Sequence, residues 1–162
     1  MDYDPAWPQL FDNIRRRIAP AIEGMNVRIE HVGSTAVPGL AAKPLIDLDV
    51  VVRKSRDVEA VGERLASIGY VPEGDLGVAG REAFACPPDG LYHHLYVVVD
   101  GNAAHRNHID FRDYLRKHPE EARRYADQKR EVAYLLDVDR EAYVEAKSGV
   151  VQEILKRARG GD

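Results

Sequence analysis

The sequence predicts an α/β (α+β) fold in which a half of mixed strands and helices, residues 1–104, precedes an all-helical half, residues 105–162. Two apolar runs, at residues 45–52 and 93–99, are typical of buried strands. From about residue 107 to the C-terminus the apolar residues recur only at helical spacing. No change of composition marks a linker between the halves, and 162 residues suit one domain.

The first half predicts two helices and three main strands. The expected elements are helices at residues 8–22 and 57–68 and strands at residues 27–32, 45–52 and 93–99. Gly24 and Gly69 follow the two helices, as glycine often does at a helix end. Short strands and turns are expected over residues 70–88, where glycine and proline recur.

The second half predicts three helices. They are expected at residues 107–117, 119–136 and 140–159. Pro119 suits a first helical turn, and the two glutamates that follow it favour the positive end of a helix dipole. Asp139 is expected to cap the last helix.

The composition narrows the class of function. The chain is 44% hydrophobic and 31% charged with a net charge of −4, which disfavours nucleic acid and membranes as partners because their binders carry a basic excess. Cys86 is the single cysteine, so no internal disulfide can form. No apolar run reaches the length of a membrane span, and the N-terminus lacks a signal-peptide pattern. We therefore expect a cytoplasmic protein.

Two aspartates interrupt the most apolar strand. Because residues two apart face the same side of a strand, Asp47 and Asp49 are expected side by side. Two carboxylates in a water-poor cleft repel, and a hard divalent cation such as Mg²⁺ relieves that repulsion. The alternative interpretation is an exposed strand face with no ligand.

A Gly-Ser pair precedes this strand. Gly33 would let the backbone approach a ligand closely, while free N–H groups and the Ser34 hydroxyl would hold a phosphate. Lys43, just before the acidic strand, would reach the same anion or lie in solvent as a loop lysine. A phosphate-binding element beside a metal-binding element suits a nucleoside triphosphate with Mg²⁺.

Four segments of the chain resemble a known family. They are HVGSTAVPGLAAKPLIDLDV, HHLYVV, FRDYLRKHPEEARRYADQK and YVEAKSGVVQEIL, and they come in the family's order over most of the chain. The chain resembles the GrpB family of bacterial proteins and, more distantly, the nucleotidyltransferase superfamily of the polymerase-beta kind. The resemblance implies a nucleotidyltransferase-like mixed sheet with flanking helices, followed by a C-terminal helical bundle.

The resemblance also implies roles for individual residues. It makes Ser34 a phosphate contact and Asp47 and Asp49 ligands of Mg²⁺ or Mn²⁺. The superfamily usually has a third carboxylate on a later strand, where this chain has the sequence HHLYVVVD. Asp100 and Glu82 are the remaining acidic candidates. His94 would replace the missing carboxylate as a general base, or it would be a hydrogen-bonded histidine of the sheet.

The helical half adds positive charge. Arg112, Lys129 and Lys147 are candidate phosphate contacts. Tyr125 and Tyr143 each lie four residues before one of these lysines, so a tyrosine and a lysine on one helix face could stack a base and hold a phosphate. The favoured alternative places both tyrosines in the core beside the lysine stems. A different hypothesis is a zinc site formed by histidines, with His93, His94, His105 and His108 as candidate ligands. Against it, His105 is expected to precede the helix, and no cysteine cluster supports the site.

The sequence therefore predicts Mg²⁺-dependent transfer of a nucleotidyl group from a nucleoside triphosphate to an unknown small acceptor. In the catalytic assignment Asp47, Asp49 and His94 act on the phosphate and the acceptor. A non-catalytic nucleotide-binding module of the same fold is the alternative. The resemblance implies that GrpB-like segments also occur joined to dephospho-coenzyme A kinase, which is compatible with either role. A plain interaction domain, the third class, would not need an aspartate pair in a cleft.

Overall fold

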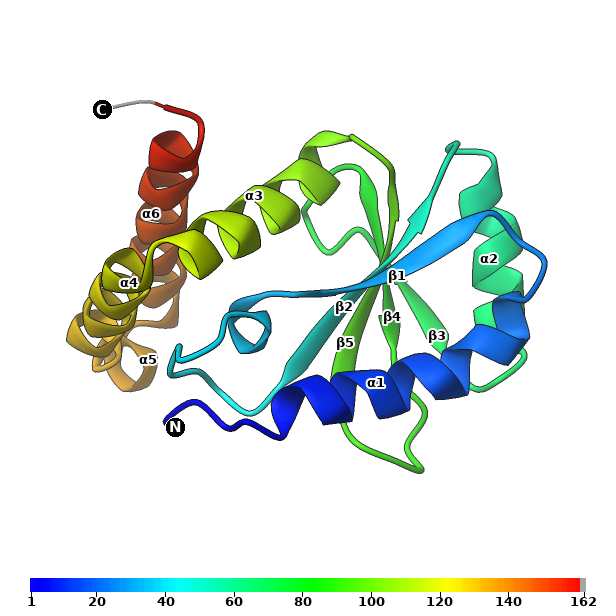
Figure 1. The fold of residues 1–162 in the computed structure, drawn as a ribbon, viewed down its shortest axis with the longest axis horizontal. Helices are drawn as coiled ribbons and strands as arrows, with labels where there is room; N and C mark the ends of the chain where they lie inside the picture. The colour runs from blue at the N-terminus through cyan, green and yellow to red at the C-terminus, as the bar shows by residue number, and fades with distance from the viewer. Residues whose placement is uncertain (161–162) are drawn as a thin grey trace.

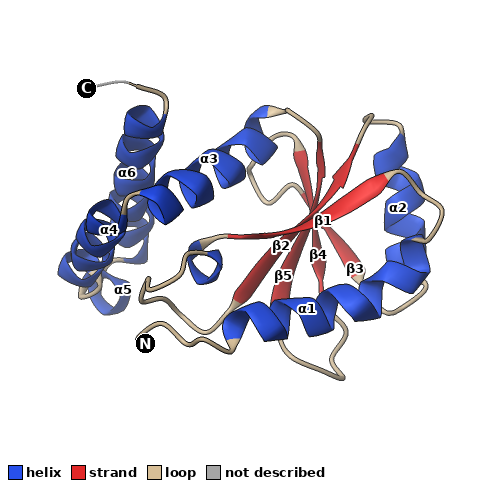
Figure 2. Ribbon diagram, in the orientation of Figure 1, coloured by secondary structure: helices blue, strands red, loops and turns tan. Residues whose placement is uncertain are grey.

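The computed structural model describes residues 1–160, so the last two residues of the predicted helical half lie outside the described part. A mixed sheet forms the centre of the molecule, with strand order β1-β2-β5-β4-β3 (Figures 1 and 2). Strands β2 and β5 are parallel, and the other neighbours are antiparallel. The predicted mixed α/β sheet with flanking helices is confirmed.

The elements have the following bounds. The strands are β1 (Val27–Val32), β2 (Ile46–Val52), β3 (Val71–Gly74), β4 (Arg81–Ala85) and β5 (His93–Val99). The α-helices are α1 (Trp7–Ile18), α2 (Asp57–Ala66), α3 (Ala103–Lys117), α4 (Pro119–Val132), α5 (Leu135–Val138) and α6 (Arg140–Ala158). Two short 3₁₀ helices are η1 (Ala19–Ile22) and η2 (Ser34–Ala36).

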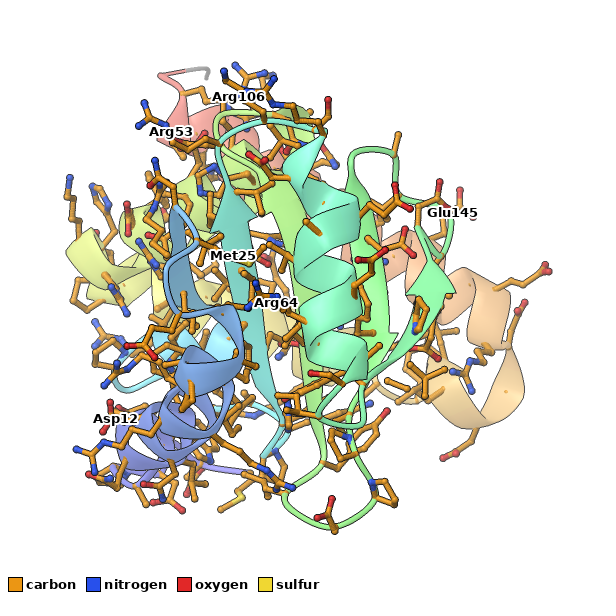
Figure 3. The ribbon with its side chains drawn as sticks, turned by 90° about the vertical axis from the view of Figure 1, so that its right-hand side faces the viewer. Asp12, Met25, Arg53, Arg64, Arg106 and Glu145 are labelled. Atoms are coloured by element: carbon orange, nitrogen blue, oxygen red, sulfur yellow. The ribbon has the colours of Figure 1, made fainter. Side chains whose placement is uncertain are left out.

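One face of the sheet packs on α1 and α2. Leu48 and Val50 of β2 and Leu95 of β5 are fully buried there in the largest apolar core. Figure 3 looks onto this side, with α2 in front of the strands. Arg64 of α2 lies near η1 in that view, and its guanidinium donates to the Ala21 carbonyl at 3.4 Å (Figure 3). The aspartate-bearing face of β2 is therefore the opposite one.

The helices α3, α4 and α6 pack together on the other side of the molecule (Figure 1). Their apolar core includes Leu115, Tyr125 and Leu155, and also Val37 and Leu40 from the loop after η2. This loop thus lies between the sheet and the helical half, and burial of its apolar side chains fixes where η2 sits.

Three predicted helices differ in their bounds from the structure. The predicted helix 8–22 is divided into α1 and the 3₁₀ helix η1. Helix α3 begins four residues earlier than expected, because the side chain of Asn102 accepts a hydrogen bond from the N–H of His105 and caps the helix there. The predicted helix 119–136 is wrong as one element: it divides where the N–H groups of Ala133 and Leu136 bond three residues back instead of four. The predicted cap of the last helix is confirmed, since Asp139 accepts from the N–H of Ala142 at 3.1 Å.

Candidate functional site

The two aspartates lie on one face of β2, as their spacing predicts. Between them, Leu48 points into the opposite core. Asp47 pairs with Val32 of β1 and with His94 of β5, while Asp49 pairs with Glu30 and with Tyr96. This pairing brings His94 beside Asp47, on the parallel neighbour of β2.

Asp47 and His94 form a hydrogen-bonded pair. The Nδ1 atom of His94 lies 2.9 Å from Oδ1 of Asp47. Because an ionised carboxylate only accepts hydrogen bonds, this contact assigns the neutral imidazole proton to Nδ1 and leaves the lone pair on Nε2. His94 is 38% exposed, and its Nε2 lies 3.4 Å from the Tyr92 hydroxyl, a long contact that a ligand hydroxyl would have to replace.

Asp49 and His108 form a second pair, deeper in the protein. The Nδ1 atom of His108, on α3, lies 2.8 Å from Oδ2 of Asp49. Asp49 is completely buried, and its Oδ1 atom has no hydrogen-bond partner. Desolvation raises the pKa of the Asp49 carboxyl, and the hydrogen bond from His108 opposes that shift. His108 had a place only in the zinc hypothesis, because no local sequence pattern links it to a strand 59 residues away.

The Gly-Ser pair forms a sharp turn against Asp47. Gly33 has φ +76° and ψ −173°, a conformation open essentially to glycine alone. A Cβ atom built on Gly33 would lie only 2.5 Å from Oδ2 of Asp47. The first N–H groups of η2, which begins at Ser34, lie outside the hydrogen bonds of that turn, as at any helix start. The Gly33 backbone therefore lies directly against the second carboxylate oxygen of Asp47, and Ser34 lines the same cavity as Asp47.

Two arginines of α3 hold this turn in place. Arg112 donates to the carbonyl of His31 at 3.1 Å, just before the turn. Arg116 donates to the carbonyl of Ala36 at 2.8 Å, just after it. The remaining contacts of Arg112 are to Asp113 and Glu30, so the structure does not bring Arg112 to the cavity with the other predicted phosphate contacts.

A cavity of about 560 Å³ opens over Asp47. The predicted site residues that line it are Gly33, Ser34, Lys43, Asp47, His94, Lys129 and Lys147. Asp49 lies beneath this lining, behind His108. Tyr143, expected in the core, lines the cavity instead, whereas Tyr125 is buried in the helical core as predicted.

Three lysines give the cavity a positive wall. Burial, together with the charges of Lys147, Lys43 and Arg130, lowers the pKa of Lys129 to about 8. Partial desolvation and the charge of Lys43 also lower the pKa of Lys147. Within residues 1–160, none of the three lysines has a carboxylate within 4.0 Å. Like charges gathered without counter-ions suit an anionic ligand.

The acidic candidates for a third carboxylate lie elsewhere. Glu82 pairs with Val97, on the opposite face of the sheet, and accepts from the N–H of Gly74. Asp100 binds Arg28 at 2.9 Å. In the strand position beside Asp49 stands Tyr96, whose pKa burial raises to about 12.

The four histidines of the zinc hypothesis have separate partners. His93 bonds to Tyr70 and to the Leu91 carbonyl on the far face of the sheet. His105 lies inside α3 rather than before it, so that expectation is wrong, and its Nδ1 accepts from the N–H of Gly101. In the described part of the chain, no group of three or more His, Cys, Asp or Glu side chains is placed to hold a metal ion.

The aspartates nevertheless fit a divalent cation of the kind the fold implies. Each has one oxygen held by a histidine and a second oxygen free of that bond: Oδ2 of Asp47 and the unpartnered Oδ1 of Asp49. Hard cations prefer such carboxylate oxygens, and an orphaned buried oxygen is costly without a partner.

A family model described as GrpB protein matches residues 1–157. The chain belongs to the GrpB family. A UPF0157 protein of Halalkalibacterium halodurans is 37% identical, and the match covers 98% of this chain and 80% of that protein. YqkA of Bacillus subtilis, also a UPF0157 protein, is 37% identical over 81% of this chain, which spans 38% of the length of YqkA. A dephospho-CoA kinase of Mycolicibacterium paratuberculosis is 27% identical, with 96% of this chain and 44% of the kinase covered.

Solved structures support the same placement. The crystal structure of GrpB from Enterococcus faecalis has a TM-score of 0.82 at 31% identity, with 98% of this chain and 95% of that chain covered. Cid1, described as an RNA terminal uridylyl transferase, has a TM-score of 0.52 at 16% identity, covering 81% of this chain and 39% of that one. This chain thus has the GrpB fold and a fold similar to that of Cid1, as the nucleotidyltransferase-like resemblance implied. Among the described residues, no helix is both long and apolar enough to cross a membrane.

Proposed function

We propose that this GrpB protein is a nucleotidyltransferase that moves a nucleotidyl group from a nucleoside triphosphate to a small acceptor. One observation carries the proposal: the Gly33-Ser34 turn, the Asp47–His94 pair and the lysine wall meet in one cavity. The turn would hold a phosphate, the pair would supply a carboxylate and an oriented base, and the lysines would neutralise the charge of a polyphosphate.

The lysine wall and Ser34 hold the triphosphate tail. The Ser34 hydroxyl and the free N–H groups at the start of η2 bind one phosphate, while Lys43, Lys129 and Lys147 neutralise the others. When bound, Mg²⁺ or Mn²⁺ on Asp47 and Asp49 neutralises charge on the phosphate oxygens. With the tail held in this way, the α-phosphorus would lie over the Asp47 end of β2.

The transfer needs a proton acceptor near the attacking atom. The acceptor oxygen or nitrogen forms a bond to the α-phosphorus, the bond from that phosphorus to the pyrophosphate oxygen breaks, and pyrophosphate leaves. The proton of the attacking group passes to Nε2 of His94. Asp47 holds His94 in the required tautomer through the 2.9 Å bond at Nδ1.

A screen for pyrophosphate release tests the enzyme. The protein, Mg²⁺, each nucleoside triphosphate and fractions of a metabolite extract are combined, and pyrophosphate is measured. Asp47→Asn gives the background. His94→Ala should reduce release by about 10²-fold or more, the size typical of losing a positioned general base, with little change in triphosphate affinity. His118→Ala is the matched control, because His118 ends α3 outside the cavity.

A nucleotide-binding module without catalysis is the second candidate. Two observations favour it: Tyr96 stands where a third carboxylate would lie, and Asp49 is sealed beneath His108. If no triphosphate and acceptor give pyrophosphate above the Asp47→Asn background while nucleotide binds the wild type, the binding module replaces the enzyme. Release that survives His94→Ala intact keeps the enzyme and moves the proton to another acceptor.

A further inference from the structure

The row of residues that contains Asp47 continues across the sheet beyond the cavity. Strand pairing sets Val32, Asp47, His94, Ala85 and Val71 in one line, from β1 to β3. Beyond His94, Ala85 is half-buried and Val71 is 58% exposed. Helices α1 and α2 cover the opposite face, so the small side chains of Ala85 and Val71 face outward. We call His94, Ala85 and Val71, with the neighbouring Tyr92, the outer row.

Aromatic rings border the outer row. Tyr92 is 64% exposed, its ring centroid lies 5.6 Å from that of His94, and its hydroxyl lies 3.4 Å from Nε2 of His94, where the acceptor hydroxyl would take its place. The His94 ring is in turn 6.2 Å from the ring of Tyr96. An exposed tyrosine beside a flat surface of small residues is suited to stacking a planar ring.

A cation lies along the strands from the outer row: Arg81 of β4 pairs with Val98 of β5, and its guanidinium reaches back to Tyr96. The Cζ atom of Arg81 is 4.6 Å from the Tyr96 ring centroid. The Nε atom of Arg81 donates to the Asp75 carbonyl at 3.1 Å, which fixes the guanidinium. Within residues 1–160 its two Nη groups make no hydrogen bond, and no carboxylate lies within 4.0 Å of them. They are available to an anion.

The outer row also lies on the side of Asp47 where an acceptor must enter. The Gly33-Ser34 turn follows β1, on one side of β2, whereas His94 lies on β5, on the other side. Attack on phosphorus is roughly in line with the departing oxygen. A pyrophosphate held near Ser34 therefore requires a nucleophile that approaches past His94.

We propose that the outer row is the acceptor subsite, and that the acceptor is a planar heteroaromatic ring that carries an anionic group and a hydroxyl. The ring stacks on Tyr92 above Ala85, the anion pairs with Arg81, and the hydroxyl meets Nε2 of His94, which lies between them. A nucleoside monophosphate has this chemistry. The inference rests on the proposed function, since it names the acceptor class of the same site.

The test separates the two sites by their alanine methyl groups. Protein with ¹³C-labelled alanine methyls is saturated with Mg²⁺ and a non-hydrolysable triphosphate analogue, then titrated with AMP or with adenosine. Ala126 and Ala133 line the cavity and report the analogue, while Ala85 reports the outer row. AMP should shift the methyl resonance of Ala85, and it should bind at least about tenfold more tightly than adenosine.

Variants identify the contacts. Tyr92→Ala should weaken the affinity for AMP at least about tenfold, which is the loss expected when one stacked ring is removed. Arg81→Gln should remove the preference for AMP over adenosine. Tyr134→Ala is the matched control, because Tyr134 is 66% exposed and lies outside the cavity lining; its AMP affinity should equal that of the wild type.

Three results would overturn the acceptor subsite: AMP shifts confined to Ala126 and Ala133, no AMP binding at all, or unchanged affinity in Tyr92→Ala. Failure of the proposed function looks different. In that case the triphosphate analogue leaves the methyls of Ala126 and Ala133 unshifted, while AMP alone still shifts Ala85 if the outer row binds a ring and an anion.

Discussion

The Nδ1 atom of His94 lies 2.9 Å from Oδ1 of Asp47, across two parallel strands at the same register. The bond fixes the tautomer of the imidazole and takes one of the two carboxylate oxygens. Asp49 and His108 repeat the arrangement one step deeper. Each aspartate of the strand therefore has a histidine partner, and the geometry of the site depends on contacts between distant parts of the chain.

Gly33→Ala should destabilise the fold more than Gly39→Ala. Both glycines have positive φ, +76° and +82°, so both variants carry backbone strain of about 1–3 kcal/mol. Only at Gly33 would the new Cβ meet Oδ2 of Asp47, at 2.5 Å, while nothing lies within 4 Å at Gly39. Overpacking of this kind adds about 1–3 kcal/mol, which urea unfolding of the two variants measures. Equal losses would show that the turn yields without strain against Asp47.

Mg²⁺ or Mn²⁺ should raise the melting temperature by mass action, and Asp47→Asn with Asp49→Asn should abolish that shift. With a chelator present to remove the metal, the Asp49→Asn variant should be no less stable than the wild type at pH 7. The substitution removes a fully buried carboxylate, and burial raises the pKa of this carboxyl group because the charged form is poorly solvated. Asp137→Asn, at an exposed position, is the control. A metal shift of wild-type size in the double variant would rule the site out.

Ser34→Ala should weaken triphosphate binding far more than nucleoside binding. A hydrogen bond to a charged group contributes about 1.5–3 kcal/mol, so the loss should be about tenfold or more in titration calorimetry. Ser148→Ala, on the exposed surface of α6, should bind like the wild type. Unchanged triphosphate affinity in Ser34→Ala would remove this hydroxyl from the site.

Triphosphate affinity should fall as the pH rises through about 8. The free protein loses the Lys129 proton there, because burial and the neighbouring lysines lower its pKa to about 8, whereas a bound anion favours the charged form. Lys129→Arg keeps its charge over pH 7.5–9.5, so its binding curve should be flatter. Lys54→Arg, at an exposed position outside the cavity, should keep the wild-type slope. An identical slope in Lys129→Arg would separate Lys129 from the ligand.

His31 should make the fold sensitive to acid. Burial lowers its pKa to about 4, below the ordinary value of 6.5, and it stacks on Phe11 and bonds to Thr35. Between these two pKa values the unfolded chain binds more protons than the folded protein, so stability falls as the pH drops from 6.5 to 4. The loss at pH 4 should approach about 3 kcal/mol. In His31→Gln the unfolding free energy should change less over this range; an unchanged pH profile would assign the acid sensitivity to other groups.

Strand and helix periodicities determined a good part of this protein from sequence. Alternation in residues 46–52 requires Asp47 and Asp49 to share a face, because side chains in a strand repeat every two residues. The chain order also suggested His94 as the histidine near the site. Local patterns suffice for such features because backbone geometry alone relates the residues.

Tertiary packing decided the rest. His108 reaches Asp49 only because α3 packs against the aspartate-bearing side of the sheet, and Arg112 turns to the His31 carbonyl because the same helix lies over β1. Tyr143 lines the cavity although its spacing suited a core position. The direction of each of these side chains depends on where a whole helix docks. Docking is set by the summed burial of apolar side chains such as Val37 and Leu115, and no short stretch of sequence contains that sum.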